Sequence, residues 1–160
     1  MVENFETAQS SDTRTEIDII FQGLTILVVD DDKNHLSLIS YLFNKYGVHV
    51  MLADNASLAF ELIQQHAVDI LISDIAMPGK DGYWLIQQVR SLPVSPIKEI
   101  PAIALSGVSK EECYEKALAS GFQTYIQKPS TPSYLMKEVA KLLLLDCQNT
   151  QRILAPTSQY

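Results

Sequence analysis

The segment over residues 70–74 constrains the fold more than any other part of the chain. Ile70, Leu71 and Ile72 form a continuously apolar run, which is typical of a short strand buried on both faces. Because such a strand needs helices on both sides of its sheet, the run predicts an α/β fold with a parallel sheet. The run ends at Ser73 and Asp74. Asp74 would then lie at the carboxyl end of a central strand, where open α/β sheets place their functional residues.

Four more segments have the composition of buried strands, and each is followed by a helical pattern. The additional strands are predicted over residues 25–29, 48–52, 100–105 and 122–127. Apolar residues at spacings of three and four predict amphipathic helices after each strand. Five strands that alternate with five helices over residues 24–145 predict one domain with a parallel sheet and right-handed crossovers.

Capping residues mark where these helices begin. Asn55 or Asp54, Asp81 and Thr131 are expected N-caps, because their side chains accept hydrogen bonds from the first free backbone amides. Ser109, followed three residues later by a glutamate, predicts a capping box for the fourth helix. Proline directly after Thr131 is favoured at the first position of the last helix.

Composition limits the classes of function and the compartment. The chain has 160 residues, enough for one domain, and its net charge of −7 argues against non-specific binding to nucleic acid. No apolar run approaches the roughly 18 residues that a membrane span needs, and no signal-peptide pattern opens the chain. Cys113 and Cys147 are isolated, which favours a reducing compartment, and we expect a cytoplasmic protein. We expect a flexible acidic leader over residues 1–22, a folded domain over 23–146 and a polar tail over 147–160.

Charged and polar side chains follow four of the five predicted strands. Asp30 and Asp31 follow the first strand, Asp74 the third, Ser106 the fourth and Lys128 the fifth. In a parallel sheet these ends meet at one edge, so several carboxylates, a hydroxyl and an ammonium group would share one shallow site. Carboxylates crowded together favour a bound cation, and Mg²⁺ prefers hard oxygen ligands. An aspartate beside a metal is also a credible nucleophile, so the residues predict a phosphoryl-transfer site.

These motifs resemble the receiver domain of response regulators in two-component signalling, the family of the bacterial chemotaxis regulator. The resemblance covers about residues 24–145, and four motifs carry it in order. They are the run 26–31, Asp74 followed by Met-Pro and Asp-Gly, the segment 104–107 and Lys128-Pro129. The resemblance implies a flavodoxin-like (βα)5 fold with strand order 2-1-3-4-5 and helices on both faces.

The resemblance also implies a role for each site residue. Asp74 would accept a phosphoryl group from a sensor histidine kinase or a histidine phosphotransfer protein. Asp30, Asp31, Asp74 and the backbone carbonyl of Ala76 would hold Mg²⁺. Lys128 would contact the phosphoryl group, and its bond to the following proline would be cis. Such a receiver assists its own phosphorylation and dephosphorylation but carries no separate catalytic domain.

A receiver of this kind signals through a switch. Ser106 and Tyr125 would form the switch pair, with Ser106 moving toward the phosphate and Tyr125 turning inward. The face made by helix four, strand five and helix five would then change its affinity for a downstream protein. A homodimer is a further option, since Leu142–Leu145 offers more leucines than the core of one domain needs.

Several alternatives stay open from the sequence. Asp30 and Asp32 have the D-x-D spacing of haloacid-dehalogenase-like phosphatases, but that family leaves Asp74 unexplained. A pseudo-receiver that binds partners without phosphorylation is the second alternative. The receiver would be either a stand-alone regulator or part of a hybrid histidine kinase. We expect Asp32 to face solvent or cap the first helix, and His35 to lie on the surface of that helix.

Overall fold

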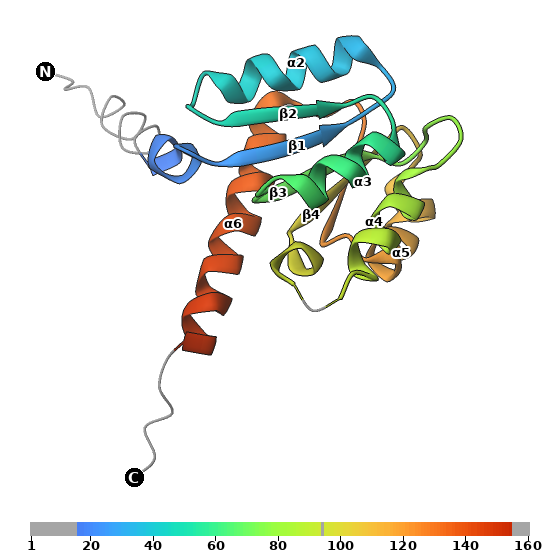
Figure 1. Cartoon of the computed structure of the whole chain (residues 1–160). Helices are drawn as coiled ribbons and strands as arrows, with labels where there is room; N and C mark the ends of the chain where they lie inside the picture. Colours follow the sequence, from blue (N-terminus) through green and yellow to red (C-terminus); the bar gives the residue numbers. More distant parts are fainter. Residues whose placement is uncertain (1–15, 94, 155–160) are drawn as a thin grey trace, which may run out of the picture.

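The computed structural model describes residues 16–93 and 95–154, and its centre is a five-stranded parallel sheet (Figure 1). The strands are β1 (Thr25–Val29), β2 (His49–Ala53), β3 (Ile70–Asp74), β4 (Ala102–Ser106) and β5 (Thr124–Gln127). Their order is β2-β1-β3-β4-β5, and all neighbouring pairs are parallel. The expected flavodoxin-like fold and its strand order are therefore confirmed.

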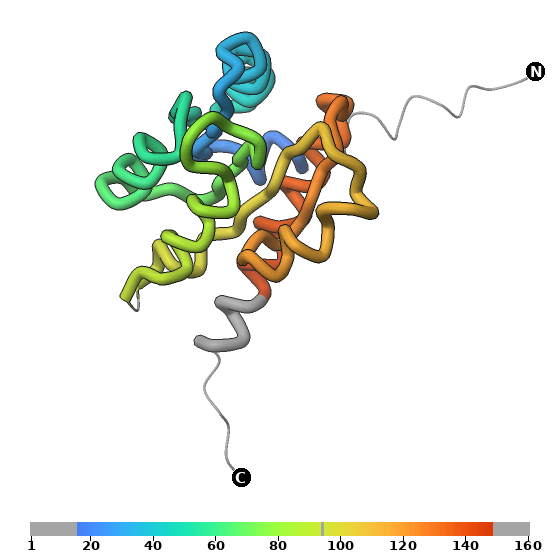
Figure 2. The backbone as a smooth tube through the Cα atoms, turned by 90° about the vertical axis from the view of Figure 1, so that its right-hand side faces the viewer, coloured from blue at the N-terminus to red at the C-terminus, as the bar shows by residue number. Residues whose placement is uncertain are grey.

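Helices cover both faces of this sheet. They are α2 (Lys33–Asn44), α3 (Ala56–Gln65), α4 (Gly82–Arg90), α5 (Lys110–Ser120) and α6 (Pro132–Leu154), with a short 3-10 helix η1 (Pro96–Glu99) before β4. One hydrophobic cluster joins the sheet to α3, α4 and α5, and a second joins it to α2 and α6. The turned view in Figure 2 separates the α2 side, in light blue, from the α3 and α4 side, in green.

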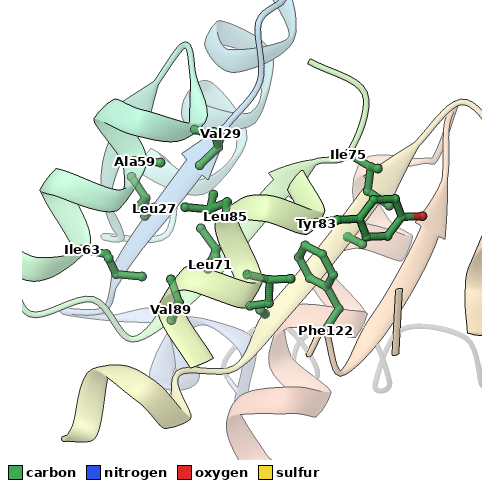
Figure 3. Close-up of a cluster of buried hydrophobic side chains, with 14 of the residues drawn as sticks. Leu27, Val29, Ala59, Ile63, Leu71, Ile75, Tyr83, Leu85, Val89 and Phe122 are labelled. Carbon is green, nitrogen blue, oxygen red and sulfur yellow. The ribbon is translucent and has the colours of Figure 1, made fainter. Parts of the chain in front are cut away.

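The run over residues 26–29 of β1 is continuously apolar because successive side chains enter different clusters. Leu27 and Val29 of β1 pack under α3 and α4, as Figure 3 shows, whereas Ile26 and Val28 pack on the opposite side. All four side chains are fully buried. A strand between two helical layers has no solvent face, so it loses the alternation that marks a half-exposed strand.

Three of the four predicted helix caps are confirmed. The side chains of Asn55, Asp81 and Thr131 each accept a hydrogen bond from the backbone amide three residues later. The predicted capping box at Ser109 is wrong, because its side chain makes no capping hydrogen bond. The amide of Lys110, at the start of α5, instead donates to the side chain of Gln127 from β5 at 3.3 Å. A partner from the neighbouring strand thus replaces the local cap.

The segment before β1 contributes to the core. Residues 16–21 are helical, and Phe21 is fully buried. Its ring packs edge-to-face on Phe43 of α2, with 5.7 Å between ring centroids, and lies 6.1 Å from the ring of Tyr46. The flexible leader that we expected over residues 1–22 falls largely on residues 1–15, which lie outside the described residues.

The last helix runs further than its buried face. Leu135, Met136 and Val139 are buried against the sheet, whereas Leu144 and Leu145 are each 48% exposed. The helix continues into the segment over residues 147–160 that was expected to be a tail, and it ends at Leu154. In Figure 1 this part of α6 extends away from the sheet. None of the helices in the described ranges is long and apolar enough to span a membrane.

Candidate functional site

The carboxyl edge of the sheet gathers three carboxylates. Asp30 and Asp31 directly follow β1, and Asp74 is the last residue of β3, the neighbouring strand. One carboxylate oxygen from each of the three lies within 4.8 Å of the other two. Asp30 and Asp74 are buried, and Asp31 is exposed. The edge therefore forms an acidic pocket that opens to solvent on the Asp31 side.

Asp30 is held by three hydrogen bonds. Its Oδ1 accepts from the backbone amide of Asp32 at 2.9 Å, and its Oδ2 accepts from Lys128 Nζ at 2.8 Å. The same Oδ2 lies 2.5 Å from Nδ1 of His35. Burial alone would raise the pKa of this carboxyl, but these hydrogen bonds stabilise the charged form more strongly. The net effect lowers the pKa of Asp30 to about 2, so Asp30 is ionised at neutral pH.

Asp74 has the opposite electrostatic character. Burial raises the pKa of its carboxyl, and the negative charges of Asp30 and Asp31 raise it further, against the opposing attraction of Lys128. Its side chain is 8% exposed. Burial is thus the main cause of the raised pKa, and a bound cation beside this carboxyl would stabilise its charged form.

Lys128 lies between the two buried carboxylates. Its Nζ is 2.8 Å from Asp30 Oδ2 and 3.4 Å from Asp74 Oδ1. Burial acts to lower the pKa of this ammonium group, but the two carboxylates outweigh it and the pKa is raised. Lys128 is therefore charged at neutral pH. The bond from Lys128 to Pro129 is cis, as expected.

The donor set fits a magnesium ion. All three acidic side chains offer hard oxygen atoms, the pocket keeps an exposed side for water ligands, and imidazole and thiolate are absent from the described metal-ligand cluster. This acidic pocket is of the type typical of Mg²⁺ binding. Ala76 lies two residues after Asp74 in an exposed loop position, and the role of its backbone carbonyl stays a prediction.

Ser106 and Tyr125 are linked through one loop residue. The hydroxyl of Ser106 accepts a hydrogen bond from the amide of Val108 at 3.2 Å, and the hydroxyl of Tyr125 donates to the carbonyl of Val108 at 2.6 Å. Both side chains are almost fully buried. Tyr125 thus already points inward in this structure. The expected movement of the switch pair stays a prediction.

His35 and Asp32 connect α2 to the pocket. Asp32 is the N-cap of α2, and its carboxylate accepts hydrogen bonds from the amides of Asn34 and His35. The expectation that Asp32 caps the first helix is therefore confirmed. The expectation of a helix-surface role for His35 is wrong, because its ring contacts Asp30. The first turn of α2 returns toward the end of β1, so a residue five positions after Asp30 can reach back to it. The spacing of five residues between Asp30 and His35 is the sequence feature that could have indicated this contact.

Ser106 ends β4, the neighbour of the strand that ends at Asp74, and this arrangement matches a known family. The model of the response regulator receiver domain matches residues 26–140. The chain belongs to this family. The receiver domain is not a distinct family of catalytic enzymes.

Relatives of this receiver occur in proteins of different length. A protein of Leptolyngbya boryana, described as an uncharacterized 14.6 kDa protein, is 40% identical over 121 residues, which cover 76% of this chain and 91% of the relative. Probable histidine kinase 6 of Oryza sativa is 28% identical over 139 residues, which cover 76% of this chain but 14% of the kinase. The receiver therefore spans nearly all of one relative and a small part of the other.

Solved structures agree with the family match. The receiver domain of Francisella response regulator 1452 is 28% identical and has a TM-score of 0.71, and the alignment covers 78% of this chain and 99% of that one. The chain is thus a receiver of the two-component type, related to receivers that are part of histidine kinases.

The opposite pKa directions of the two buried carboxyls give a paired prediction. Because the folded pKa of Asp30 is depressed, its contribution to stability is present above about pH 4 and is lost as the pH falls through about 2. Because the folded pKa of Asp74 is raised above 3.8, stability falls as the pH rises from that value through the folded pKa. At pH 7 we expect Asp30→Asn to lower the free energy of unfolding by about 1–3 kcal/mol and Asp74→Asn to raise it.

Urea unfolding without metal at pH 7 and pH 3 measures both changes. The stabilisation by Asp74→Asn should vanish at pH 3, and Asp54→Asn, which changes an exposed carboxylate, serves as the control. If both substitutions in the pocket change the free energy of unfolding in the same direction at pH 7, the opposite pKa directions of Asp30 and Asp74 are refuted.

Proposed function

We propose that this receiver accepts a phosphoryl group on Asp74 in a Mg²⁺-dependent reaction. The observation that carries the proposal is the position of the Asp74 carboxylate, which lies at the end of central β3, within 4.8 Å of Asp30 and Asp31 oxygens and 3.4 Å from Lys128 Nζ. A nucleophilic carboxylate, an acidic pocket and a cation at this spacing are the parts that phosphoryl transfer needs.

The donor is proposed to be a sensor histidine kinase or a histidine phosphotransfer protein. Receivers of two-component systems interact with histidine kinases, and the family match supports this choice. A carboxylate oxygen of Asp74 would attack the phosphorus of a phosphohistidine. The P–N bond would break, the imidazole would leave with its electron pair, and an acyl phosphate would form on Asp74.

Each neighbouring group has a part in this reaction. Mg²⁺, when held by Asp30, Asp31, Asp74 and the carbonyl of Ala76, would neutralise charge on the phosphoryl oxygens. The ammonium group of Lys128, which lies between the two carboxylates, would turn to the same phosphoryl oxygens and form an ion pair with them. Ser106, the last residue of β4, would donate a hydrogen bond to one phosphoryl oxygen.

The output is proposed to be a change at the face of α5, β5 and α6. The Tyr125 ring comes from β5, and its hydroxyl holds the loop that leads into α5. A hydroxyl of Ser106 that turns to the phosphate would release the Val108 amide and alter that loop. A downstream protein would read the change, whether the receiver acts alone or within a longer kinase.

Intact-mass measurement after incubation with acetyl phosphate tests the proposal. We expect one phosphoryl adduct on the wild type in the presence of Mg²⁺, and none after chelation of the metal. Asp74→Asn should give no adduct, whereas Asp54→Asn, at an exposed aspartate after β2, should react like the wild type. Failure to form an adduct, together with failure to bind beryllofluoride, would identify a pseudo-receiver that acts without phosphorylation.

A further inference from the structure

The Asp30 carboxylate has more donors than an isolated metal ligand would need. Its Oδ2 is shared by Lys128 Nζ at 2.8 Å and by His35 Nδ1 at 2.5 Å, while Oδ1 accepts from the Asp32 amide. The ionised carboxylate only accepts hydrogen bonds, so Nδ1 of His35 carries the proton and donates it. Asp30 is 1% exposed, and water has little room to replace a lost donor.

The two donors on Oδ2 differ in how they are attached. Lys128 follows β5 and is also within 3.4 Å of Asp74 Oδ1, so it is divided between two carboxylates. His35 belongs to the first turn of α2, a different element, and within the part of the chain that the structure describes its side chain makes its polar contact with Asp30. A phosphoryl group on Asp74 would present three charged oxygens to Lys128 and draw it away from Asp30. The position of His35 does not depend on that movement.

We propose that His35 is a positioning residue that keeps the Asp30 carboxylate in its metal-binding orientation when Lys128 turns to the phosphoryl group. The proposal rests on the proposed function and extends it to a residue outside the acidic cluster. A hydrogen-bonded partner of a ligating carboxylate fixes the orientation of the ligand, and loss of such partners typically weakens metal binding by about 10–100-fold. Here the loss of Mg²⁺ affinity on removal of the His35 side chain should be small while Lys128 contacts Asp30 and large once Lys128 has left it.

Calorimetric titration with Mg²⁺ measures this dependence in four proteins: the wild type, His35→Ala, Lys128→Met and the double variant. With Lys128 present, we expect His35→Ala to weaken Mg²⁺ binding about threefold or less, because Lys128 still holds Asp30. Without Lys128, the same change should weaken binding about tenfold or more. Saturation of the Lys128-containing proteins with beryllofluoride, which occupies Lys128, should also increase the effect of His35→Ala to about tenfold.

Two further variants separate positioning from a general structural role. His35→Asn keeps an N–H donor near the position of Nδ1, so it should bind Mg²⁺ within about twofold of the wild type in every background. His49→Ala removes an exposed histidine from the start of β2, at the opposite edge of the sheet, and should change nothing. Folding should be retained, because the side chain of His35 is 26% exposed and its removal leaves no closed cavity.

Each result supports or overturns the inference. An equal effect of His35→Ala with and without Lys128, no effect at all, or tighter binding of Mg²⁺ would overturn it. If the wild type binds neither Mg²⁺ nor beryllofluoride, the proposed function fails. Nitrogen NMR of the His35 ring in the metal-free protein then tests whether the hydrogen bond from His35 to Asp30 forms. A proton on Nδ1 that shifts downfield in Lys128→Met would support the shared hydrogen bond, and an unchanged signal would contradict it.

Discussion

Replacement of Phe21 by alanine is expected to lower the free energy of unfolding by about 3–5 kcal/mol, the usual cost of removing a fully buried phenylalanine. The ring is 0% exposed and packs edge-to-face on Phe43, so its removal leaves a cavity that Phe43 and Tyr46 would line. The site lies at the carboxyl end of β1, whereas Phe21 precedes the amino end of that strand, so phosphorylation per folded molecule should be unchanged.

Urea unfolding followed by circular dichroism measures the loss, and the chain supplies its own control. Ile19 belongs to the same short helix but is 70% exposed, so Ile19→Ala should cost less than about 0.5 kcal/mol. A Phe21→Ala protein that unfolds within about 1 kcal/mol of the wild type would show that residues 16–21 do not dock on the domain in solution.

Replacement of Gly82 by alanine is the second substitution with a large expected effect. Gly82 begins α4, and its amide donates to the carbonyl of Ile75 at 2.9 Å. A Cβ atom there would overlap the carbonyl oxygen of Asp74 and come within 2.8 Å of the Cα atom of Ile75. Both neighbours are backbone, so either α4 or the end of β3 must move. We expect a loss of about 2–3 kcal/mol in stability.

The same substitution should also damage the site, because the displaced backbone is that of Asp74. We expect the rate of phosphorylation by acetyl phosphate to fall at least tenfold at saturating Mg²⁺, since a displacement of about 1 Å can cost about 100-fold in rate. Gly107→Ala is the matched control for stability, because a Cβ at that glycine meets no atom within 4 Å. Normal stability and normal phosphorylation of Gly82→Ala would refute the close approach of α4 to the end of β3.

The sheet could be predicted from the sequence because its central strands are buried on both faces. Residues such as Ile70, Leu71 and Ile72 have no solvent-facing position, and a polar or acidic residue marks where each central run ends. Topology then brings Asp30 and Asp74 together without any information on side-chain rotamers. The gathering of acids at one edge therefore follows from strand ends alone.

Contacts that depend on a particular side-chain direction could not be predicted in the same way. The docking of Phe21 depends on six helical residues, too few to show a clear period, and on an aromatic partner 22 positions later. The contact of His35 with Asp30 requires the first turn of α2 to lie directly over the end of β1. The failed cap at Ser109 reflects competition from Gln127, a residue of another strand. In each case tertiary contacts override the local pattern.

The length of α6 has a mechanical consequence. The helix begins three residues after the cis Lys128–Pro129 pair, and its buried side chains, Leu135 to Val139, lie within its first two turns. From Pro132 to Gln148 the helix measures about 25 Å. A tilt at the buried turns, which follow Lys128 closely along the chain, would therefore be amplified toward the exposed end of the helix. A tilt of about 10° at the buried turns would move Gln148, roughly 16 Å further along the helix, by about 3 Å.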